Sequence, residues 1–366
     1  MIEFQIRKDD FRVHRIVSFT TADSEAALAD GDIRVRIEYF AFTANNVTYA
    51  VTGDRIGYWQ FFPPGGEDAD GWGMMPVWGF AEVIASKTAD IPVGERLFGY
   101  FPPATQLDLT PTRITPQRFI DGAAHRADLP AGYNLYTRVN AEPGYDRAGD
   151  NERMLLWPLH ITSFCLWDAL QSEDWYGAQQ VVIVSASSKT SIGLAYALDD
   201  DATAPPSIAI TSKRNLDFVN KLGLYEQSVT YETLSDVDAA IPTVIVDMAG
   251  NGEVLGRLHA HLGDNMKRCI KVGLTHWDEA KPGAGVIAER SKFFFAPTHI
   301  QQRMQDWGPD GFAKKTASFM QQTAMKSRTW LRLRKIDGLQ GLADVYEDVC
   351  EGRIAADEGL IIELTP

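Results

Sequence analysis

Cysteine is scarce in this sequence, and its scarcity excludes two kinds of site. The 366 residues contain three cysteines, Cys165, Cys269 and Cys350, which lie far apart and form no CxxC pair. An odd number of scattered cysteines disfavours both a disulfide framework and a cysteine-rich zinc site. We therefore expect a protein that works without a bound metal.

Long apolar runs and an excess of positive charge are also missing. No run approaches the roughly 20 apolar residues that cross a bilayer, and the opening MIEFQIRKDDFRVHRIV has no signal-peptide pattern. The formal net charge of −14 repels phosphate backbones and anionic lipid. We expect a cytoplasmic monomer or homodimer that acts on a small molecule, with neither nucleic acid nor membrane as a partner.

The composition is that of a globular protein with two domains. Hydrophobic residues make up 45% and charged residues 23% of the chain, which is enough apolar material for two cores. Residues 1–150 predict strands and loops, because 33–39 alternate apolar and polar residues and 77–85 and 92–100 have strand character. Frequent prolines and glycines disfavour long helices there.

From about residue 150 the pattern changes to alternating helices and strands. Short apolar strands between helices are typical of βαβ units and a parallel sheet. Near the C-terminus, residues 339–351 predict an amphipathic helix and 359–364 a strand, which either closes the parallel sheet or returns to the first domain. The other expected elements are the helices 154–172, 192–198 and 215–222, the last ended by Gly223, and the strands 180–185, 207–211, 243–247 and 269–273.

A polar turn joins the first of these strands to the next helix. This is where a Rossmann fold binds the pyrophosphate of a dinucleotide, because backbone N–H groups at a helix start attract anions. Only Gly193 remains of a G-x-G-x-x-G pattern, so the alternative is a plain strand-to-helix turn with a serine cap. The residues that we expect at the cofactor are Ser185, Ser187, Ser188, Lys189 and Thr190.

The end of the following strand carries basic rather than acidic residues. An acid at this position would bind the ribose 2′-hydroxyl of NAD, whereas Ser212, Lys213 and Arg214 suit a 2′-phosphate. The alternative is an ordinary basic helix start, although positive charge is unfavourable at a helix N-terminus. The sequence therefore favours NADP(H) over NAD(H).

Several segments, in order along the chain, resemble the zinc-independent, quinone-oxidoreductase-like medium-chain dehydrogenases/reductases. That resemblance implies a GroES-like β-rich catalytic domain over 1–150, completed by about 331–366, and a Rossmann NADP(H)-binding domain over 151–330. It also places Tyr231, Ala249, Gly250 and Gly273 at the cofactor. The segments that carry it are 41–49 with Gly53, 92–99, 211–215 with 218–219 and 222–223, Tyr231, 247–250 and 338–364.

Three other segments resemble a side branch of the same superfamily, to which no general activity is attached. They are Ser185–Thr190, Thr275–Trp277 and Phe294–Pro297. Two departures from the wider family stand out. Two glycines of its phosphate-binding turn are replaced, so hydroxyl groups are expected to help to hold the pyrophosphate. The cysteine and histidine ligands of its zinc-dependent members are missing.

Hydride transfer without a metal needs a proton donor and a partner for the developing oxyanion. Tyr49 is the first candidate, with a core aromatic as the alternative. Asn45 and Asn46 could hold a carbonyl oxygen or the nicotinamide amide, or serve as turn residues. His276 follows the last expected strand, at the edge where ligands bind, and could polarise a carbonyl. His160 and Asp168 are weaker candidates.

The stretch from Tyr58 to Trp78 is rich in aromatic residues. It predicts either a lid over an apolar substrate or a loop that packs its own cluster. The expected substrate-pocket residues are Asn45, Tyr58, Trp59, Trp78, Trp277 and Phe294.

Three functions are compatible with these features. The leading hypothesis is a zinc-independent oxidoreductase that uses NADPH to reduce an activated C=C or C=O of a small, apolar or aromatic molecule. The others are a non-redox lyase or aldolase-like enzyme and a catalytically inactive NADP(H)-binding sensor or scaffold. One fold hosts many chemistries, so turnover is the discriminating observation.

Overall fold

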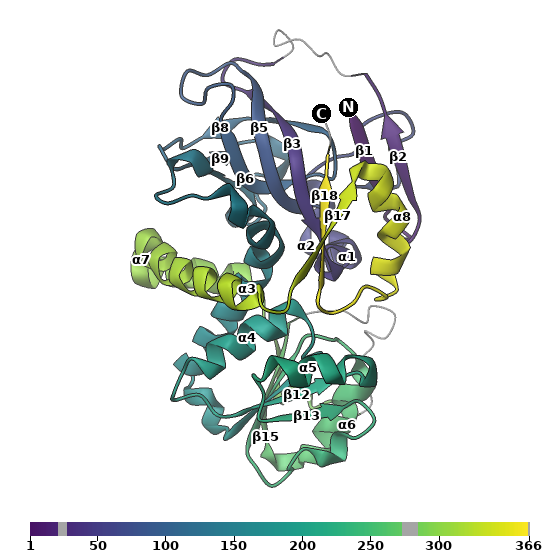
Figure 1. Cartoon of the computed structure of the whole chain (residues 1–366), viewed down its shortest axis with the longest axis vertical. Helices are drawn as coiled ribbons and strands as arrows, with labels where there is room; N and C mark the ends of the chain where they lie inside the picture. The colour runs from purple at the N-terminus through teal and green to yellow at the C-terminus, as the bar shows by residue number, and fades with distance from the viewer. Residues whose placement is uncertain (21–27, 273–284, 365–366) are drawn as a thin grey trace. The chain divides into compact units, whose positions relative to one another are not determined.

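The computed structural model describes residues 1–20, 28–272 and 285–364. The chain divides into two compact units (Figure 1). Met1–Leu155 and Arg332–Pro366 form the first, called the β-rich unit below, and Leu156–Leu331 form the second, the parallel-sheet unit.

The β-rich unit is built on a mainly antiparallel sheet. Its two long central strands, β3 (Ile33–Phe42) and β5 (Val77–Ser86), pair with one another, and β6 continues the sheet beside β5. The strand order is β17-β18-β3-β5-β6-β10-β9-β8, with β7 also pairing with β3, and a smaller sheet has the order β2-β1-β4. The remaining strands are β1 (Ile2–Arg7), β2 (His14–Ser18), β4 (Trp72–Gly73), β6 (Arg96–Phe101), β7 (Gln106–Leu109), β8 (Pro111–Thr112), β9 (Arg118–Asp121) and β10 (Leu135–Arg138).

The C-terminal segment belongs to the β-rich unit, which settles the alternative that the sequence left open. β17 (Arg332–Asp337) runs parallel to β18 (Glu358–Glu363), and β18 pairs antiparallel with β3, for example Leu360 with Phe42. Between them, the helix α8 (Gly338–Cys350) buries Leu342 and Tyr346. Figure 1 shows these yellow elements beside the purple strands β1 and β2.

Short helices interrupt the strands and loops that the sequence predicts for this unit. The helices α1 (Ala44–Val51) and α2 (Gly53–Ile56) follow β3 directly. α1 begins with a capping box. The Asn46 side-chain oxygen accepts a hydrogen bond from the Thr43 N–H, and the Thr43 hydroxyl accepts one from the Asn45 N–H. Such reciprocal caps satisfy N–H groups that a helix start leaves without partners, so a helix forms where strand and loop were expected.

The parallel-sheet unit has the strand order β13-β12-β11-β14-β15-β16, with every neighbouring pair parallel. Numbered within the sheet, this is the order 3-2-1-4-5-6 of a Rossmann fold. Its strands are β11 (Gln180–Val184), β12 (Ser207–Thr211), β13 (Gln227–Thr230), β14 (Thr243–Asp247), β15 (Met266–Lys271) and β16 (Ser291–Phe293). The helices between them are α4 (Lys189–Asp199), α5 (Leu216–Leu222) and α6 (Gly252–Leu262).

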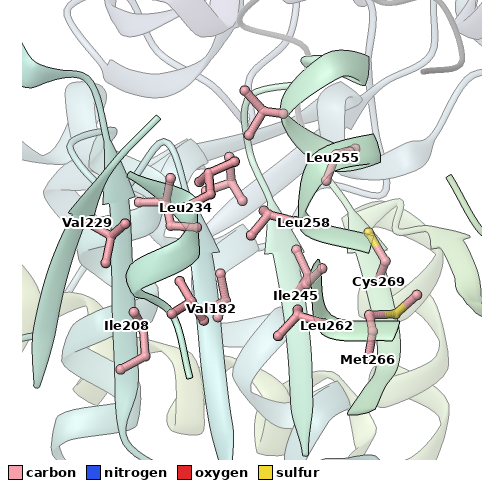
Figure 2. Packing of buried hydrophobic residues seen from close by; sticks show 14 of the residues in the cluster. Val182, Ile208, Val229, Leu234, Ile245, Leu255, Leu258, Leu262, Met266 and Cys269 are labelled. Carbon is pink, nitrogen blue, oxygen red and sulfur yellow. The ribbon is translucent and has the colours of Figure 1, made fainter. Parts of the chain in front are cut away.

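Apolar side chains cover both faces of this sheet. Figure 2 shows one core, in which Val182 and Ile245 of neighbouring strands face Leu258 of α6, and all three are fully buried. Leu166 of α3 and Leu194 of α4 pack against the opposite face. Burying each such side chain contributes about 1.5–3 kcal/mol, so the sheet is held rigidly enough to position the loops at its edge.

Two longer helices flank these elements. α3 (Asp150–Ser172) begins four residues before its predicted start. α7 (Ala296–Ser327) was not predicted and is broken at Gly308, whose φ of 71° lies in the left-handed region. Trp307, Phe312 and Phe319 of α7 surround Phe164 of α3. No helix in the described residues is long and apolar enough to cross a membrane.

Candidate functional site

The turn after β11 forms the start of α4. The helix begins at Lys189, three residues earlier than predicted, because Ser188 is its cap and accepts a hydrogen bond from the backbone N–H of Ser191 (3.2 Å). Lys189 and Thr190 therefore belong to the first helical turn, whose N–H groups attract an anion. Of the predicted cofactor residues, Ser187 is almost fully buried, whereas Ser188, Lys189 and Thr190 are half-buried.

Ser185 adopts a backbone conformation that favours glycine. Its φ is 64°, which costs a residue with a Cβ of the order of 1 kcal/mol. Its carbonyl oxygen accepts hydrogen bonds from the Ser188 N–H (2.9 Å) and the Ser191 hydroxyl (2.9 Å). The turn thus keeps the tight reversal of a glycine-rich loop by bonding its own serines.

Gly193, the one retained glycine, is explained by helix packing. A Cβ at this position would lie 2.6 Å from the Ser163 hydroxyl and 2.7 Å from the His160 ring. α4 can approach α3 only because this residue has no side chain. Close packing of the helix against its neighbours is one of the roles of the glycines in a Rossmann turn.

The basic segment lies at the carboxyl end of the adjacent strand β12. Lys213 and Arg214 begin a short 3₁₀ helix (Lys213–Asn215) and are exposed. The Ser212 hydroxyl is buried and has no hydrogen-bond partner among the described residues. Asn215 donates to the Ser187 hydroxyl (2.9 Å) and ties this segment to the turn after β11. The two predicted parts of the site are therefore adjacent.

Tyr231 follows β13 and reaches the same turn. Burial raises the pKa of its hydroxyl to about 12, while an interaction with Ser185 acts in the opposite direction. Its carbonyl accepts a hydrogen bond from Arg257 of α6 (3.0 Å). The next residue, Glu232, has its carboxyl pKa lowered by hydrogen bonds from the Thr230 hydroxyl and its own backbone N–H and, less strongly, by the nearby Lys213 and Arg257. An acid thus lies near the basic segment.

The third predicted contact region is the turn after β14. The Asp247 carboxylate accepts hydrogen bonds from the N–H groups of Ala249 (2.9 Å) and Gly250 (3.1 Å). Burial raises the pKa of Asp247 to about 6. Because both N–H groups are engaged, these two residues can contact a cofactor only through their other atoms.

In the β-rich unit, the structure separates the two neighbouring asparagines. Asn46 is buried, accepts from the Thr43 N–H (2.8 Å) and donates to the Pro76 carbonyl (2.9 Å). Its amide oxygen takes part in the cap of α1 and its amide nitrogen donates to Pro76, and these contacts compete with the catalytic role predicted for it. Asn45 lies one helical turn before Tyr49, and its side chain interacts with the Tyr49 hydroxyl.

Tyr49 itself is buried among aromatic residues. Its hydroxyl also interacts with Trp78 and Tyr100, and burial raises its pKa well above the usual range. The Tyr58 ring packs against it in a tilted arrangement, with 4.5 Å between ring centroids. The Tyr49 ring is therefore surrounded by aromatic side chains, while its hydroxyl has polar partners.

The predicted aromatic lid is a buried cluster in this structure. Tyr58, Trp59 and Trp78 are each less than 7% exposed. Trp59 lies directly against Gly53 and Gly73, where no Cβ would fit. This arrangement fits a loop that packs its own aromatic side chains, and the substrate-pocket role of these residues stays a prediction.

The other predicted residues lie in the parallel-sheet unit. Phe294 follows β16 and packs against the core of the sheet. His160 is fully buried, its Nδ1 lies 2.9 Å from the Thr323 hydroxyl, and burial lowers its pKa to about 4. Asp168 joins α3 to α7 by accepting from His299 (2.6 Å) and Arg303 (2.5 Å). Burial alone would raise its pKa, but these two partners hold it below the usual range.

Three predicted residues, Gly273, His276 and Trp277, lie outside the described residues. Conversely, sequence reasoning did not single out Tyr100 and Tyr133, which complete the aromatic cluster around Tyr49. No local motif marks them, since they lie on β6 and on a 3₁₀ helix (Ala131–Asn134) far along the chain. The three cysteines are buried and free, and the described residues bring together no group of three or more metal-ligating side chains.

Solved structures share this fold at low sequence identity. CurA from Vibrio vulnificus in complex with NADPH matches with a TM-score of 0.66 and 12% identity over 100% of both chains. The yhdH oxidoreductase from Salmonella enterica in complex with NADP has a TM-score of 0.55 and 12% identity over 100% of both chains. A mutant form of enoyl thioester reductase from Candida tropicalis has a TM-score of 0.57 and 11% identity over 99% of both chains.

These likenesses confirm the predicted fold, a GroES-like β-rich unit with a Rossmann unit. No curated protein matches the sequence. Residues 40–355 match the family described as protein of unknown function (DUF2855). Because that match covers most of the chain, the protein belongs to the DUF2855 family.

Proposed function

We propose that this protein is an NADP(H)-dependent, zinc-independent reductase of an activated C=C or C=O in a small, apolar molecule. The observation that carries the proposal is the convergence of three segments at one edge of the Rossmann sheet. They are the strained serine turn at Ser185, the Ser212–Arg214 segment joined to it through Asn215, and Tyr231. Similar structures that bind NADPH or NADP support it.

The residues at this edge fit the cofactor. The first turn of α4, with Lys189 and Thr190, is suited to the pyrophosphate. The Ser212 hydroxyl, buried without a described partner, and the exposed Lys213 and Arg214 are suited to the 2′-phosphate. The bound NADPH would supply a hydride to the substrate.

The matching proton would come from the β-rich unit. Tyr49 carries a neutral hydroxyl, because burial raises its pKa, and a neutral phenol can donate to a carbonyl oxygen or to an enolate. Asn45, on the same face of α1, would hold the oxygen that gains charge. We assign Asn46 no part in this step, because its amide oxygen accepts in the cap of α1 and its amide nitrogen donates to Pro76.

The test is a fluorescence titration with NADPH and NADH. We expect the wild-type protein to bind NADPH at least about tenfold more tightly, a difference of about 1.4 kcal/mol. A Lys213→Ala/Arg214→Ala double variant should lose this preference without losing NADH affinity. Glu232→Gln is the matched control, because it removes the acid near Lys213 and should increase the preference.

Two results would contradict the proposal. If neither nucleotide binds, the cofactor assignment is wrong. If NADPH binds but no enone, quinone or aldehyde oxidises it, the reductase assignment is wrong, and the non-redox enzyme and the nucleotide-binding sensor are the functions left.

A further inference from the structure

Trp330 lies in the turn after α7 and contacts two other helices of the parallel-sheet unit. Its indole N–H donates to the Tyr196 hydroxyl on α4 (2.7 Å). Its ring meets the Phe218 ring on α5 edge-on, with 5.6 Å between the centroids. Tyr196 is buried, whereas Phe218 and Trp330 are half-buried. We call these three residues the aromatic bridge.

The two bridged helices follow the two parts of the proposed cofactor site. α4 begins at the serine turn, and α5 directly follows the 3₁₀ helix that carries Lys213 and Arg214. Phe218 lies four residues after Arg214, so Trp330 contacts the chain about one helical turn away from the basic segment. The aromatic bridge therefore links the two parts of the site at a distance from the ligand.

The short helix α5 depends on contacts with its surroundings. It has seven residues, of which Val219 is buried, and a helix of this length is marginal by itself. Phe218 packs against a small core of Ala186, Ala209 and Val219 and against Trp330. Because Ala186 belongs to the serine turn, the position of Phe218 also determines how α5 lies against that turn.

The helix α7 fixes Trp330 in its place. The backbone N–H of Trp330 donates to the carbonyl of Ser327 (3.2 Å), a fully buried residue of α7. Lys326 donates to the Asp200 carboxylate at the end of α4 (2.7 Å), and its ammonium lies 5.3 Å from the centre of the Tyr196 ring. α7 thus presents Trp330 to α4 and α5 as a rigid contact.

The serine turn has a hydrogen-bond network of its own. The Ser185 carbonyl accepts from the Ser188 N–H and from the Ser191 hydroxyl (both 2.9 Å). The basic segment is joined to this turn through the hydrogen bond from Asn215 to Ser187 (2.9 Å). Loss of the aromatic bridge should therefore displace the basic segment more than it displaces the serine turn.

We propose that Trp330 is a positioning residue that determines specificity for NADP(H), because it holds the basic segment at the distance from the serine turn that one dinucleotide requires. The proposal rests on the proposed function for the identity of the ligand. Charge-assisted hydrogen bonds to phosphate depend on short distances and good alignment, so a displaced basic segment binds the 2′-phosphate more weakly. NADPH carries that phosphate and NADH does not.

The first test compares nucleotide affinities of the full-length protein by nicotinamide fluorescence. Trp330→Leu keeps an apolar side chain but removes the ring and the indole N–H. We expect its Kd for NADPH to rise about tenfold and its Kd for NADH to stay within about twofold. Trp330→Phe retains an aromatic ring against Phe218 and should recover most of the NADPH affinity. An equal loss for both nucleotides, or no loss, would overturn the inference.

Trp167→Leu is the matched control. Trp167 is half-buried in the same unit, its indole N–H donates to Asp201 just beyond α4 (2.9 Å), and its ring packs against Phe164 of α3. The change removes the same groups near α4 and leaves the contact with Phe218 in place. The ratio of the two Kd values should stay that of the wild type. Loss of the NADPH preference in this variant as well would overturn a specific role of Trp330.

A measurement without nucleotide separates this inference from the proposed function. In the unliganded proteins, hydrogen–deuterium exchange of the backbone N–H groups in residues 213–222 reports how firmly α5 is held. We expect exchange about tenfold faster in Trp330→Leu than in the wild type, and unchanged exchange in Trp167→Leu. If the wild type binds neither nucleotide, the proposed function is wrong, while faster exchange in Trp330→Leu would still show that Trp330 holds α5. Unchanged exchange in Trp330→Leu would overturn the inference alone.

Discussion

The serine turn of the parallel-sheet unit and the tyrosine ring of the β-rich unit are built in different ways. The turn is made by residues adjacent in sequence, from Ser185 to Ser191, and works through backbone geometry. The ring is made by Tyr49, Tyr58, Tyr100 and Tyr133, which lie on the helix α1, on two 3₁₀ helices and on the strand β6, and it works through side-chain contacts.

The difference also concerns charge. The tyrosines keep their protons at neutral pH, because burial raises all four pKa values. Beside the serine turn lie two groups that titrate in acid, His160 and Asp247. In mild acid we therefore expect changes of protonation beside the serine turn and none in the tyrosine ring.

The largest expected effect concerns how the stability of the fold depends on pH. The pKa of His160 is lowered to about 4, so the unfolded chain binds more protons than the folded one between pH 4 and 6.5, and stability falls as the pH drops through this window. The pKa of Asp247 is raised from 3.8 to about 6, so the folded chain binds more protons there, and stability falls as the pH rises. Each effect is on the order of 3 kcal/mol, and the two oppose one another.

Single variants separate the two contributions to the pH dependence of stability. Asp247→Asn retains an oxygen that accepts from Ala249 and Gly250, and it should become more acid-sensitive than the wild type in urea denaturation between pH 4 and 6.5. His160→Gln should lose stability as the pH rises instead. If both variants kept the wild-type pH dependence, the burial of these two groups would not be what governs it.

The next effect tests how tightly the turn is packed. Alanine at Gly193 would gain up to about 1 kcal/mol of helix propensity, yet its Cβ would meet Ser163 and His160 at 2.6 and 2.7 Å. We expect a net loss of about 1–3 kcal/mol in the free energy of unfolding, measured by urea denaturation. Adding Ser163→Ala should restore part of it.

The β-rich unit supplies the control. Gly132, next to Tyr133, has open space where a Cβ would go and no positive φ. Gly132→Ala should change stability by less than about 1 kcal/mol. An equal loss at both positions would mean that contact with α3 is not the reason for glycine at residue 193.

The fold was predictable from the sequence where a segment's surroundings are uniform. β12 and β14 lie exactly at the predicted residues 207–211 and 243–247, because a strand covered on both faces is a continuous apolar run. α7 escaped prediction because its buried residues are Thr316, Thr323 and Ser327. A helix whose buried residues are small and polar has no apolar stripe to detect.

The candidate site shows the same division. The cofactor segments were found because a strand, a turn and a helix start are consecutive in sequence, and the structure joins two of them through Ser187 and Asn215. The tyrosine ring was missed beyond Tyr49 and Tyr58, because its members meet only once β6 and the 131–134 helix are in place. Asn46 illustrates the limit of composition, because an amide that caps a helix has the same composition signal as one that binds a ligand.

The smallest effect asks whether the serine turn is strained in the way that its backbone indicates. With φ at 64°, Ser185→Gly removes the steric cost of a Cβ but adds conformational freedom to the unfolded chain, so its net effect should be small. Ser185→Ala keeps the Cβ and removes only the hydroxyl that interacts with Tyr231. We expect the glycine variant to be more stable than the alanine variant by about 1 kcal/mol in parallel urea denaturations. Equal stabilities would mean that the turn relaxes around a Cβ. The hydrogen bonds of its serines would then fix the turn less firmly than aromatic contacts fix the tyrosine ring.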